Sequence, residues 1–450
     1  MKEPVRRVFL VTCLLVLCHE TAAERLGWAY AEADTQSWPD ARSGAASWAD
    51  QQGGFWLFGG SGLGVGDNPI PLNDLWYFSQ IEERWNMLQP RGVIPPGRYM
   101  ASACGVSDLM FVVSGGLGID GYGFDDTWVY SITNNTWLPL KNQTRPSARG
   151  EGATWCTDRY MYVFGGIHLG QLQSDHWQFS LEALTWTPVT TPGEEANQTD
   201  HNSESPSERN AAMTWVFKDS LYMFGGNISQ SEELVYSSCL WSYSMRSRKW
   251  QLLHGLDNNQ LPVYYNCSYV NCTPGGRTGS ATWVDPRGYL WLFGGERLMW
   301  SRMSKLSAVF VGDTWVYDTT KNRWFWIAGK NSEEKARSVA APEVSGFHFT
   351  PGARYGSTAW HSGNRFYLFA GVIHSSMSAL FMNDLWYFQV FGDQHFTLGN
   401  VMLILIVAVL LVSVLIIVAL LARRKGTDNF SQSTKYSLLM ETTSFDASCN

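Results

Sequence analysis

The chain has 450 residues and a formal net charge of −7, and 16% of its residues are charged and 14% aromatic. This acidic balance gives no electrostatic reason to expect nucleic-acid binding. The length is sufficient for a large buried core.

The N-terminus, residues 1–23, is typical of a secretory signal peptide. Lys2, Arg6 and Arg7 precede the apolar run Val8–Cys18, and small residues at 21–23 indicate cleavage after Ala23. The alternative is a disordered start of a cytosolic protein, which the membrane-type C-terminus described below disfavours.

An internal repeat begins at residue 39, and its skeleton returns in six copies. Each copy has Pro-x-x-Arg, a Trp six residues after the Arg, an apolar run ending in Gly-Gly, Asp-x-Trp, and a second Trp nine residues later. Four departures stand out: Cys104 replaces the first Trp, Cys239 replaces the Asp, Ala370-Gly371 replaces the glycine pair, and the sixth copy lacks its closing Trp. The arginines of the six copies are Arg42, Arg98, Arg149, Arg209, Arg277 and Arg354.

Each copy reads as four short strands bounded by turn residues. A four-stranded unit cannot bury both faces alone, so the copies must stack, and radial stacking gives a β-propeller. The paired glycines and the two later tryptophans resemble the kelch-repeat family over roughly residues 25–390. The resemblance implies an all-β, six-bladed kelch β-propeller at residues 24–392.

The sixth copy needs a fourth strand, and we predict that Gln36–Trp38 supplies it. An N-terminal strand would then close the ring and remove free sheet edges. Among extracellular proteins the chain is similar to attractin-like glycoproteins, at the level of the propeller only. It has no BTB domain.

Residues 401–422 predict one C-terminal transmembrane helix after a juxtamembrane segment, 393–400. The run carries no charge and is long enough for a bilayer, which needs about 20 residues. Arg423-Arg424-Lys425 follows as a cytoplasmic flank. We therefore expect a single-pass type I membrane protein, with residues 423–450 as the cytoplasmic tail.

The tail holds Tyr436-Ser437-Leu438-Leu439, which matches a clathrin-adaptor sorting signal in Tyr436 and Leu439; a chance match in a disordered tail is the alternative. The N-x-Ser/Thr pattern predicts glycosylation at Asn134, Asn142, Asn197, Asn227, Asn266 and Asn271. Cys267 and Cys272 lie close in one loop and are a candidate disulfide. The pairing of Cys104, Cys156 and Cys239 is open, and burial of Cys104 and Cys239 as small apolar residues is one interpretation.

Loop lengths differ between the two rims of the predicted propeller. At one rim lie the turns between the first and second strands, which are short, and the turns between the third and fourth strands, which have a constant length. From each closing Trp to the next Arg, at the other rim, the separations are 13, 12, 23, 27 and 30 residues. We call this second rim the long-loop rim. Variable loops on a rigid scaffold are where binding surfaces are usually built, and we expect this rim to point away from the membrane.

Two sets of residues are candidates for ligand binding. The six motif arginines should ring the channel mouth at the long-loop rim, where an Arg fork suits carboxylates or sulfates. The alternative is that each Arg binds loop carbonyls or a nearby Asp and holds the blades together. The second set is Arg297, Trp300 and Arg302 in the loop Glu296–Asp313, which is either an exposed contact or a helix-like cap with Trp300 buried.

The sequence favours a non-enzymatic module that binds a protein or glycan partner through its long-loop rim. It carries no Gly-x-Ser-x-Gly, phosphate-loop or dinucleotide motif, and its loop histidines lack metal-ligand spacing, so we expect no cofactor and no metal. The alternative is a membrane-anchored carbohydrate-active or copper oxidase-type kelch enzyme, with a dispersed active site. The expected location is the plasma membrane or the endosome and lysosome, with the propeller outside the cytosol.

Overall fold

The computed structural model describes residues 28–31, 37–50, 53–64, 68–107, 109–141, 144–190, 205–230, 233–255, 272–300, 306–329, 350–363, 365–374 and 379–389. Contacts divide the chain into residues 1–390 and 391–450, and the second unit lies wholly outside the described residues. The predicted signal peptide, juxtamembrane segment, transmembrane run and sorting motif are therefore all outside them. Among the described residues, no helix has the length and apolar character to cross a bilayer.

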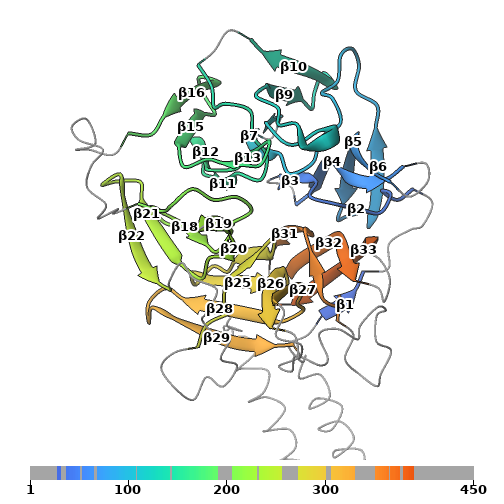
Figure 1. The fold of residues 1–450 in the computed structure, drawn as a ribbon. Coiled ribbons are helices and arrows are strands. Elements are labelled where there is room, and N and C mark those ends of the chain that lie inside the picture. Colours follow the sequence, from blue (N-terminus) through green and yellow to red (C-terminus); the bar gives the residue numbers. More distant parts are fainter. Residues whose placement is uncertain are drawn as a thin grey trace, which may run out of the picture. The chain divides into compact units, whose positions relative to one another are not determined.

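Almost all regular structure in these ranges is β-strand, as predicted, and it forms six successive antiparallel sheets (Figure 1). Sheet 1 contains β2 (Arg42–Ser43), β3 (Ala46–Ala49), β4 (Phe55–Leu63), β5 (Pro69–Ser79) and β6 (Arg84–Leu88). Sheet 2 contains β7 (Ser102–Ser107), β8 (Met110–Ser114), β9 (Thr127–Ser131) and β10 (Thr136–Leu140). Sheet 3 contains β11 (Ala153–Cys156), β12 (Tyr160–Phe164), β15 (His176–Ser180) and β16 (Thr185–Pro188).

Sheet 4 contains β17 (Met213–Phe217), β18 (Ser220–Phe224), β21 (Leu240–Ser244) and β22 (Lys249–His254). Sheet 5 contains β24 (Ala281–Val284), β25 (Tyr289–Phe293), β28 (Thr314–Asp318) and β29 (Arg323–Ala328). Sheet 6 contains β30 (Arg354–Tyr355), β31 (Thr358–Ser362), β32 (Arg365–His374), β33 (Ala379–Gln389) and β1 (Trp28–Tyr30).

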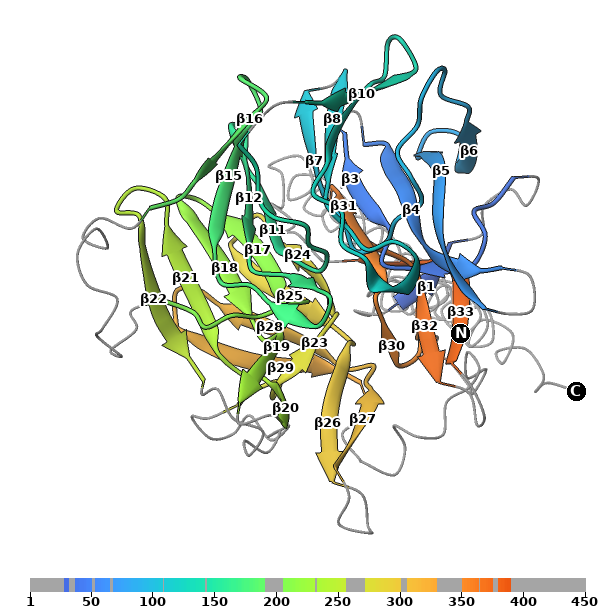
Figure 2. The same ribbon diagram turned by 45° about the horizontal axis from the view of Figure 1, so that its top comes forward.

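Smaller elements project from the ends of the second strands. They are η2 (Ile119–Gly121), β13 (Ile167–His168) with β14 (Gln171–Leu172), β19 (Asn227–Gln230) with β20 (Glu233–Tyr236), and β23 (Arg277–Thr278) with β26 (Glu296–Trp300) and β27 (Leu306–Phe310). In Figure 2 the β26–β27 hairpin extends beyond the neighbouring strands.

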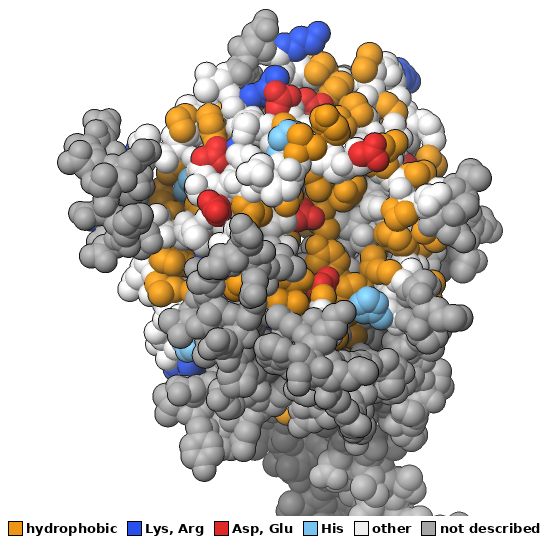
Figure 3. Space-filling model, viewed as in Figure 1, with side chains coloured by type: hydrophobic (Ala, Val, Ile, Leu, Met, Phe, Trp, Pro, Cys, Tyr) orange, Lys and Arg blue, Asp and Glu red, His pale blue; other side chains and the backbone are white. Residues whose placement is uncertain are grey.

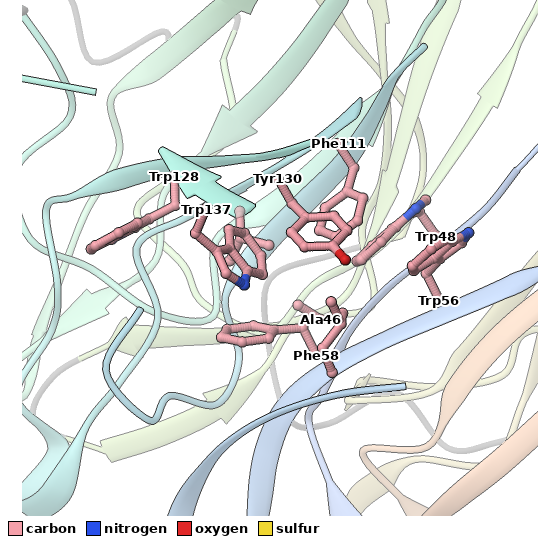
Figure 4. Close-up of a cluster of buried hydrophobic side chains, with 10 residues drawn as sticks. Ala46, Trp48, Trp56, Phe58, Phe111, Trp128, Tyr130 and Trp137 are labelled. Atoms are coloured by element: carbon pink, nitrogen blue, oxygen red, sulfur yellow. The ribbon is translucent and has the colours of Figure 1, made fainter. Parts of the chain in front are cut away.

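The core lies between successive sheets, because each sheet is covered on both faces. The second strands consequently read as unbroken apolar runs, and Phe55, Trp56, Leu57 and Phe58 of β4 are all at most 4% exposed. Figure 4 shows one such layer, in which Trp48 and Trp56 of sheet 1 meet Phe111 and its neighbours in sheet 2. Equivalent clusters join each pair of successive sheets, and one joins sheet 6 to sheet 1.

The turn before each closing tryptophan has the same backbone in five copies, which explains the constant nine-residue spacing. The residue two positions before that Trp has a positive φ of 50–56° in each case: Glu83, Asn135, Leu184, Arg248 and Asn322. A left-handed residue at a fixed place fixes the turn, so the length cannot vary without breaking the strand register.

The strand that completes sheet 6 is β1, and the prediction of Gln36–Trp38 is wrong. Trp28 of β1 lies opposite Phe388 of β33, which is the register that Trp85 has with Phe78 in sheet 1. The Trp28 ring packs against Trp283, with centroids 5.9 Å apart, and against Phe293 at 4.8 Å. Trp28 is therefore the sixth closing tryptophan. Trp38 instead donates from its indole to the carbonyl of Asn383.

A cyclic set of backbone hydrogen bonds links the six copies at the residue two positions after each motif arginine. The amide of Met100 donates to the carbonyl of Gly44 (2.7 Å), and Glu151 donates to Met100 (2.9 Å). In the same way Ala211 donates to Glu151, Gly279 to Ala211, and Gly356 to Gly279. The amide of Gly44 donates to the carbonyl of Gly356 (2.9 Å), so the series returns to its first residue. All six residues have positive φ. We call this set the axial hydrogen-bond ring.

Candidate binding surface at the long-loop rim

The six motif arginines are buried, each at most 4% exposed, and each anchors the same local arrangement. In sheet 1, Arg42 donates from Nη1 to Asp74 Oδ1 and from Nη2 to Asp74 Oδ2, both at 2.7 Å. Arg42 Nη1 also donates to the carbonyl of Gly59 at 2.8 Å, and the indole of Trp76 donates to Asp74 Oδ2 at 2.6 Å. The aspartate thus ties the strand entry to the tryptophan of its own motif.

Four other copies repeat this bidentate pair. They are Arg98–Asp126, Arg149–Asp175, Arg277–Asp313 and Arg354–Asp384. In sheet 4, where Cys239 stands at the aspartate position, Arg209 donates from Nη1 to Ser237 Oγ at 3.3 Å and to the carbonyl of Gly225. All six arginines thus bind loop carbonyls, and five of them also bind an aspartate of their own copy. Ligand binding by these arginines stays a prediction.

In three of these pairs the arginine lowers the pKa of a partly or fully buried aspartate. Burial alone would raise the pKa of Asp313, but the charge and hydrogen bonds of Arg277 outweigh it and hold that pKa below its ordinary value. Arg98 and Arg149 lower the pKa values of Asp126 and Asp175 against the same effect of burial. Asp126, Asp175 and Asp313 are therefore charged partners of their arginines at neutral pH.

The glycine pairs allow neighbouring sheets to approach each other. Gly225 has a φ of +72°, and a Cβ there would lie 2.4 Å from the carbonyl oxygen of Arg277 in the next copy. The amide of Gly226 donates to that same oxygen at 3.0 Å. A side chain at this position would push the two sheets apart.

Strands β26 and β27 of the loop Glu296–Asp313 pair as a hairpin. The alternative prediction that this loop forms a helix-like cap is therefore wrong. Arg297 lies opposite Arg277 in the pairing of β23 with β26, and it is half-buried. The side chain of Trp300 and the whole of Arg302 lie outside the described residues.

The described cysteines give one disulfide that the sequence left open. Cys104 of β7 and Cys156 of β11 are bonded, with Cα atoms 5.6 Å apart, and they join sheets 2 and 3. Cys104 is therefore more than an apolar substitute for a tryptophan. Cys272 also takes part in a disulfide, but its predicted partner Cys267 lies outside the described residues. Cys239 is a buried thiol.

Two predicted glycosylation sites fall within the described ranges. Asn134 is exposed in the β9–β10 turn. Asn227 begins β19, and its Oδ1 is buried, which suits a glycan poorly. Asn142, Asn197, Asn266 and Asn271 lie outside those ranges.

Two of the loop histidines in the described ranges have local contacts. His168 Nδ1 accepts from the amide of Gly123 at 3.2 Å, and His374 stacks on Phe310 with ring centroids 4.0 Å apart. Within the described part of the chain, no group of three or more His, Cys, Asp or Glu side chains is placed to hold a metal ion.

Exposed apolar side chains gather on the long-loop rim. Those on its loops and adjoining strand ends are Leu63, Ile70, Val93, Ile94, Ile119, Tyr122, Leu169 and Leu380, whereas the described turns of the opposite rim contribute Ile81 and Leu109. Val93 is 71% exposed and Tyr122 is 62% exposed. On the face in Figure 3, hydrophobic side chains form patches with acidic ones between them. An apolar surface of this kind is typical of a protein contact.

A second feature of this rim, which sequence reasoning missed, is a cavity of about 200 Å³ at the axial hydrogen-bond ring. Glu151 and Tyr355 line it, together with small residues such as Gly44, Ala211 and Gly279. Glu151 belongs to no recognised sequence motif. At the equivalent position, three of the six copies have glycine: Gly44, Gly279 and Gly356. The replacement of glycine by glutamate at this position was the one sequence signal that could have pointed to Glu151.

Comparisons with known proteins find similarity to proteins that contain kelch repeats. The family model of the KLHDC2/KLHL20/DRC7 Kelch-repeats domain matches residues 16–150 and 52–203. The Drosophila melanogaster protein named Leucine-zipper-like transcriptional regulator 1 homolog is 28% identical over 187 residues, which is 39% of this chain and 17% of that protein. Rat Kelch domain-containing protein 3 is 23% identical over 254 residues, 53% of this chain and 60% of that protein.

Host cell factor of Drosophila melanogaster is 22% identical over 326 residues, 66% of this chain and 18% of its own length. The chain thus spans between about a sixth and three fifths of these relatives. The common part is the repeat whose arginine, aspartate, glycine and tryptophan contacts are described above. By its repeats and by these matches, the chain belongs to the kelch-repeat family.

Proposed function

We propose that this chain is a type I membrane protein whose repeats form a closed six-bladed propeller, and that its long-loop rim binds a protein partner outside the cytosol. Kelch domains generally mediate protein–protein interactions. The observation that carries the proposal is the concentration of exposed apolar residues on the long-loop rim. The rim is built from loops of several sheets, so a partner would contact several copies at once.

Closure is supported by two independent sets of contacts. The innermost strands touch in the order β3, β7, β11, β17, β24 and β31, and β31 touches β3 again. The axial hydrogen-bond ring passes through the same copies in the same order. A propeller that closes in this way is a rigid platform for its loops.

Placement outside the cytosol is supported by the Cys104–Cys156 disulfide. Structural disulfides persist in oxidising compartments and are rare in the cytosol. This bond joins two sheets of the repeat domain, and Cys272 is also oxidised. The predicted signal peptide and the apolar run 401–422 fit the same route through the membrane, to the cell surface or the endosome and lysosome.

The rim favours a protein over a glycan as partner. Ile119, Tyr122 and Leu169 are all more than half exposed, and they come from the loops that follow β8 and β12. Aliphatic side chains contribute through burial of apolar surface, which a protein partner offers and a hydrated sugar offers much less. The predicted sorting motif at Tyr436 and Leu439 would then determine the membrane compartment in which the chain binds its partner.

The proposal is tested by site-specific photo-cross-linking in cells, with benzoylphenylalanine at Tyr122 or at Leu109 of the full chain. The two positions are similarly exposed, at 62% and 58%, but lie on opposite rims. We expect a discrete cross-linked protein from position 122 and not from 109. Equal cross-linking from both, or cross-linking only from 109, would exclude the long-loop rim as the binding surface.

A further inference from the structure

Glu151 places a carboxylate on the axis of the repeat domain, and no basic side chain of the described residues acts on its pKa. Its backbone belongs to the axial hydrogen-bond ring, and its side chain lines the 200 Å³ cavity. Among the described residues, its one hydrogen-bond partner is the side-chain amide of Asn210, which donates from Nδ2 to Oε2. Burial raises the pKa of Glu151, and the Asn210 hydrogen bond opposes that rise only in part.

Asn210, which contacts this carboxylate, has a side-chain oxygen that accepts no hydrogen bond from the described residues. Asn210 is 4% exposed, and its Oδ1 has no hydrogen-bond partner among the described residues. Asn227 lies directly opposite Asn210 in an antiparallel bridge, so the two side chains share one face. The Oδ1 of Asn227 is likewise buried and without a partner in the described part of the chain.

The surroundings add more negative charge and three phenol rings. Tyr236 donates to Glu296 Oε1 at 2.7 Å. Burial, and then the charges of Glu151 and Glu296, raise the pKa of Tyr355, and Glu151 also acts on Tyr99 and Tyr236. No Lys, Arg or His side chain contributes to the pKa shifts of Glu151, Tyr99, Tyr236 or Tyr355. We call Glu151, Asn210, Asn227, Glu296 and Tyr355 the axial acceptor cluster.

Such a cluster has more acceptors than donors and more negative charge than positive. Buried polar groups are normally satisfied, and an exception calls for a functional reason. A protonated amine brings a positive charge and three N–H donors to one point. Phenol faces near a carboxylate also attract a cation.

We propose that the axial acceptor cluster is a binding pocket for a lysine side chain of the protein partner. The inference rests on the proposed function and names the chemistry by which the partner is recognised. Of these residues, Glu151 and Tyr355 line the cavity, and Asn210 contacts the Glu151 carboxylate. A cavity of about 200 Å³ with one carboxylate in its wall suits a compact ammonium better than the planar fork of an arginine. Small residues such as Gly44, Ala211 and Gly279 form much of its wall and leave room for an unbranched butyl chain.

The test is titration of the purified full-length chain with the peptide acetyl-Gly-Gly-Lys-Gly-Gly-amide and with its norleucine counterpart, followed by calorimetry. Norleucine keeps the unbranched apolar chain of lysine and lacks the ammonium. We expect the lysine peptide to bind at least tenfold more tightly. Equal affinity of the two peptides, or binding of neither, would overturn the proposal whether or not any variant folds.

Two variants locate the pocket. Glu151→Gln keeps the shape and the amide contact but removes the charge, so it should weaken the lysine peptide at least tenfold. Glu182→Gln makes the same change at an exposed glutamate of sheet 3 and should leave the affinity unchanged. A Glu151→Gln protein with near-ultraviolet circular dichroism like that of the unmodified chain and full affinity for the peptide would refute the assignment.

This failure would be distinguishable from failure of the proposed function. If cross-linking from position 122 persists while the lysine peptide does not bind, the long-loop rim still binds its partner but the cluster does not read lysine. If both signals are lost, the binding surface itself is wrong.

Discussion

Arg277 and Asp313 form a bidentate ion pair in which both side chains are shut off from solvent, at 0% and 1% exposure. Nη1 lies 2.8 Å from Oδ1 and Nη2 lies 3.1 Å from Oδ2. The equivalent pair in sheet 3 joins Arg149 to Asp175, whose side chain is 44% exposed. The same motif thus occurs in one molecule with and without access to water.

Loss of the carboxylate should therefore cost very different amounts in the two copies. Asp313→Ala leaves a buried guanidinium without its counter-charge, and we expect a loss of about 3–5 kcal/mol in the free energy of unfolding. Asp175→Ala should cost about 1 kcal/mol, because water can solvate Arg149 from the exposed side. Denaturant unfolding of the two variants checks the difference, and equal losses would show that burial does not set the strength of the pair.

Trp28 should contribute to stability as a core residue although it lies far from the rest of sheet 6 in sequence. Trp28→Ala removes a half-buried ring that packs on Trp283, Phe293 and Phe388. The expected loss is about 2–3 kcal/mol, below the range for a fully buried tryptophan. Tyr30→Ala, at a residue of the same strand that is 49% exposed, should cost much less. Thermal unfolding compares them, and a mild effect at Trp28 would mean that β1 is dispensable.

The Cys104–Cys156 bond should stabilise the domain against unfolding. It encloses 52 residues, and restriction of the unfolded chain over such a loop contributes about 4 kcal/mol in the entropic description. The double variant Cys104→Ala/Cys156→Ala should melt at a lower temperature than the unmodified chain under oxidising conditions.

Reduction provides the matched control for that disulfide. A reductant also opens the bond made by Cys272, so both proteins should lose some stability, but the double variant should lose less. Peptide mapping after thiol blocking should recover Cys104 linked to Cys156. An equal response of the two proteins to reductant would contradict a contribution from this bond.

His176 should make the domain less stable in acid. It is buried among aromatic rings, with Tyr243 at 4.8 Å, and burial lowers its pKa from 6.5 to about 3. Between these values the unfolded chain binds a proton that the folded chain does not. The free energy of unfolding should fall as pH falls, by up to about 1.4 kcal/mol per pH unit from this group.

His176→Leu isolates this contribution, because leucine stands at the corresponding register in other sheets. Leu75 and Leu240 each pair with the last phenylalanine of their second strand, as His176 does with Phe164. The variant should lose less stability than the unmodified chain between pH 7 and pH 4, and the two profiles should run parallel above pH 7. Profiles that stay parallel throughout would rule out His176 as the titrating group.

The repeat could be predicted from sequence because each motif residue meets the same partner in nearly every copy. Arginine binds aspartate, aspartate binds tryptophan, and glycine allows the next sheet to approach. Where one member changes, a neighbour compensates: Ser237 contacts Arg209 in the copy that carries Cys239. Contacts set by local spacing leave a periodic trace in the sequence.

The closing strand could have been predicted from spacing but was not. In the other copies, 12 to 30 residues separate the closing Trp from the next Arg; Trp28 precedes Arg42 by 14 and Trp38 by only 4. Four residues are too few for the rest of the strand and the loop to the next sheet. The disulfide had a similar trace, because Cys104 and Cys156 follow their motif arginines by 6 and 7 residues in consecutive copies.

The axial acceptor cluster left a weaker trace in the sequence. Asn210 and Tyr355 directly follow their motif arginines, Glu151 follows its arginine by two residues, and Asn227 and Glu296 directly follow the glycine pairs of their copies. The residue type at these positions differs from copy to copy, so a search for a repeated motif passes over them.

The axial hydrogen-bond ring has a consequence for how such a domain can change. Each of its amides is used by one neighbour and each of its carbonyls by the other, so deletion of a whole repeat would strand a donor and an acceptor far apart. Gain or loss of copies is therefore opposed by backbone geometry as well as by packing. Substitution of side chains around the axis, which leaves every one of these amides in place, is the route by which the centre of the domain can acquire new specificity.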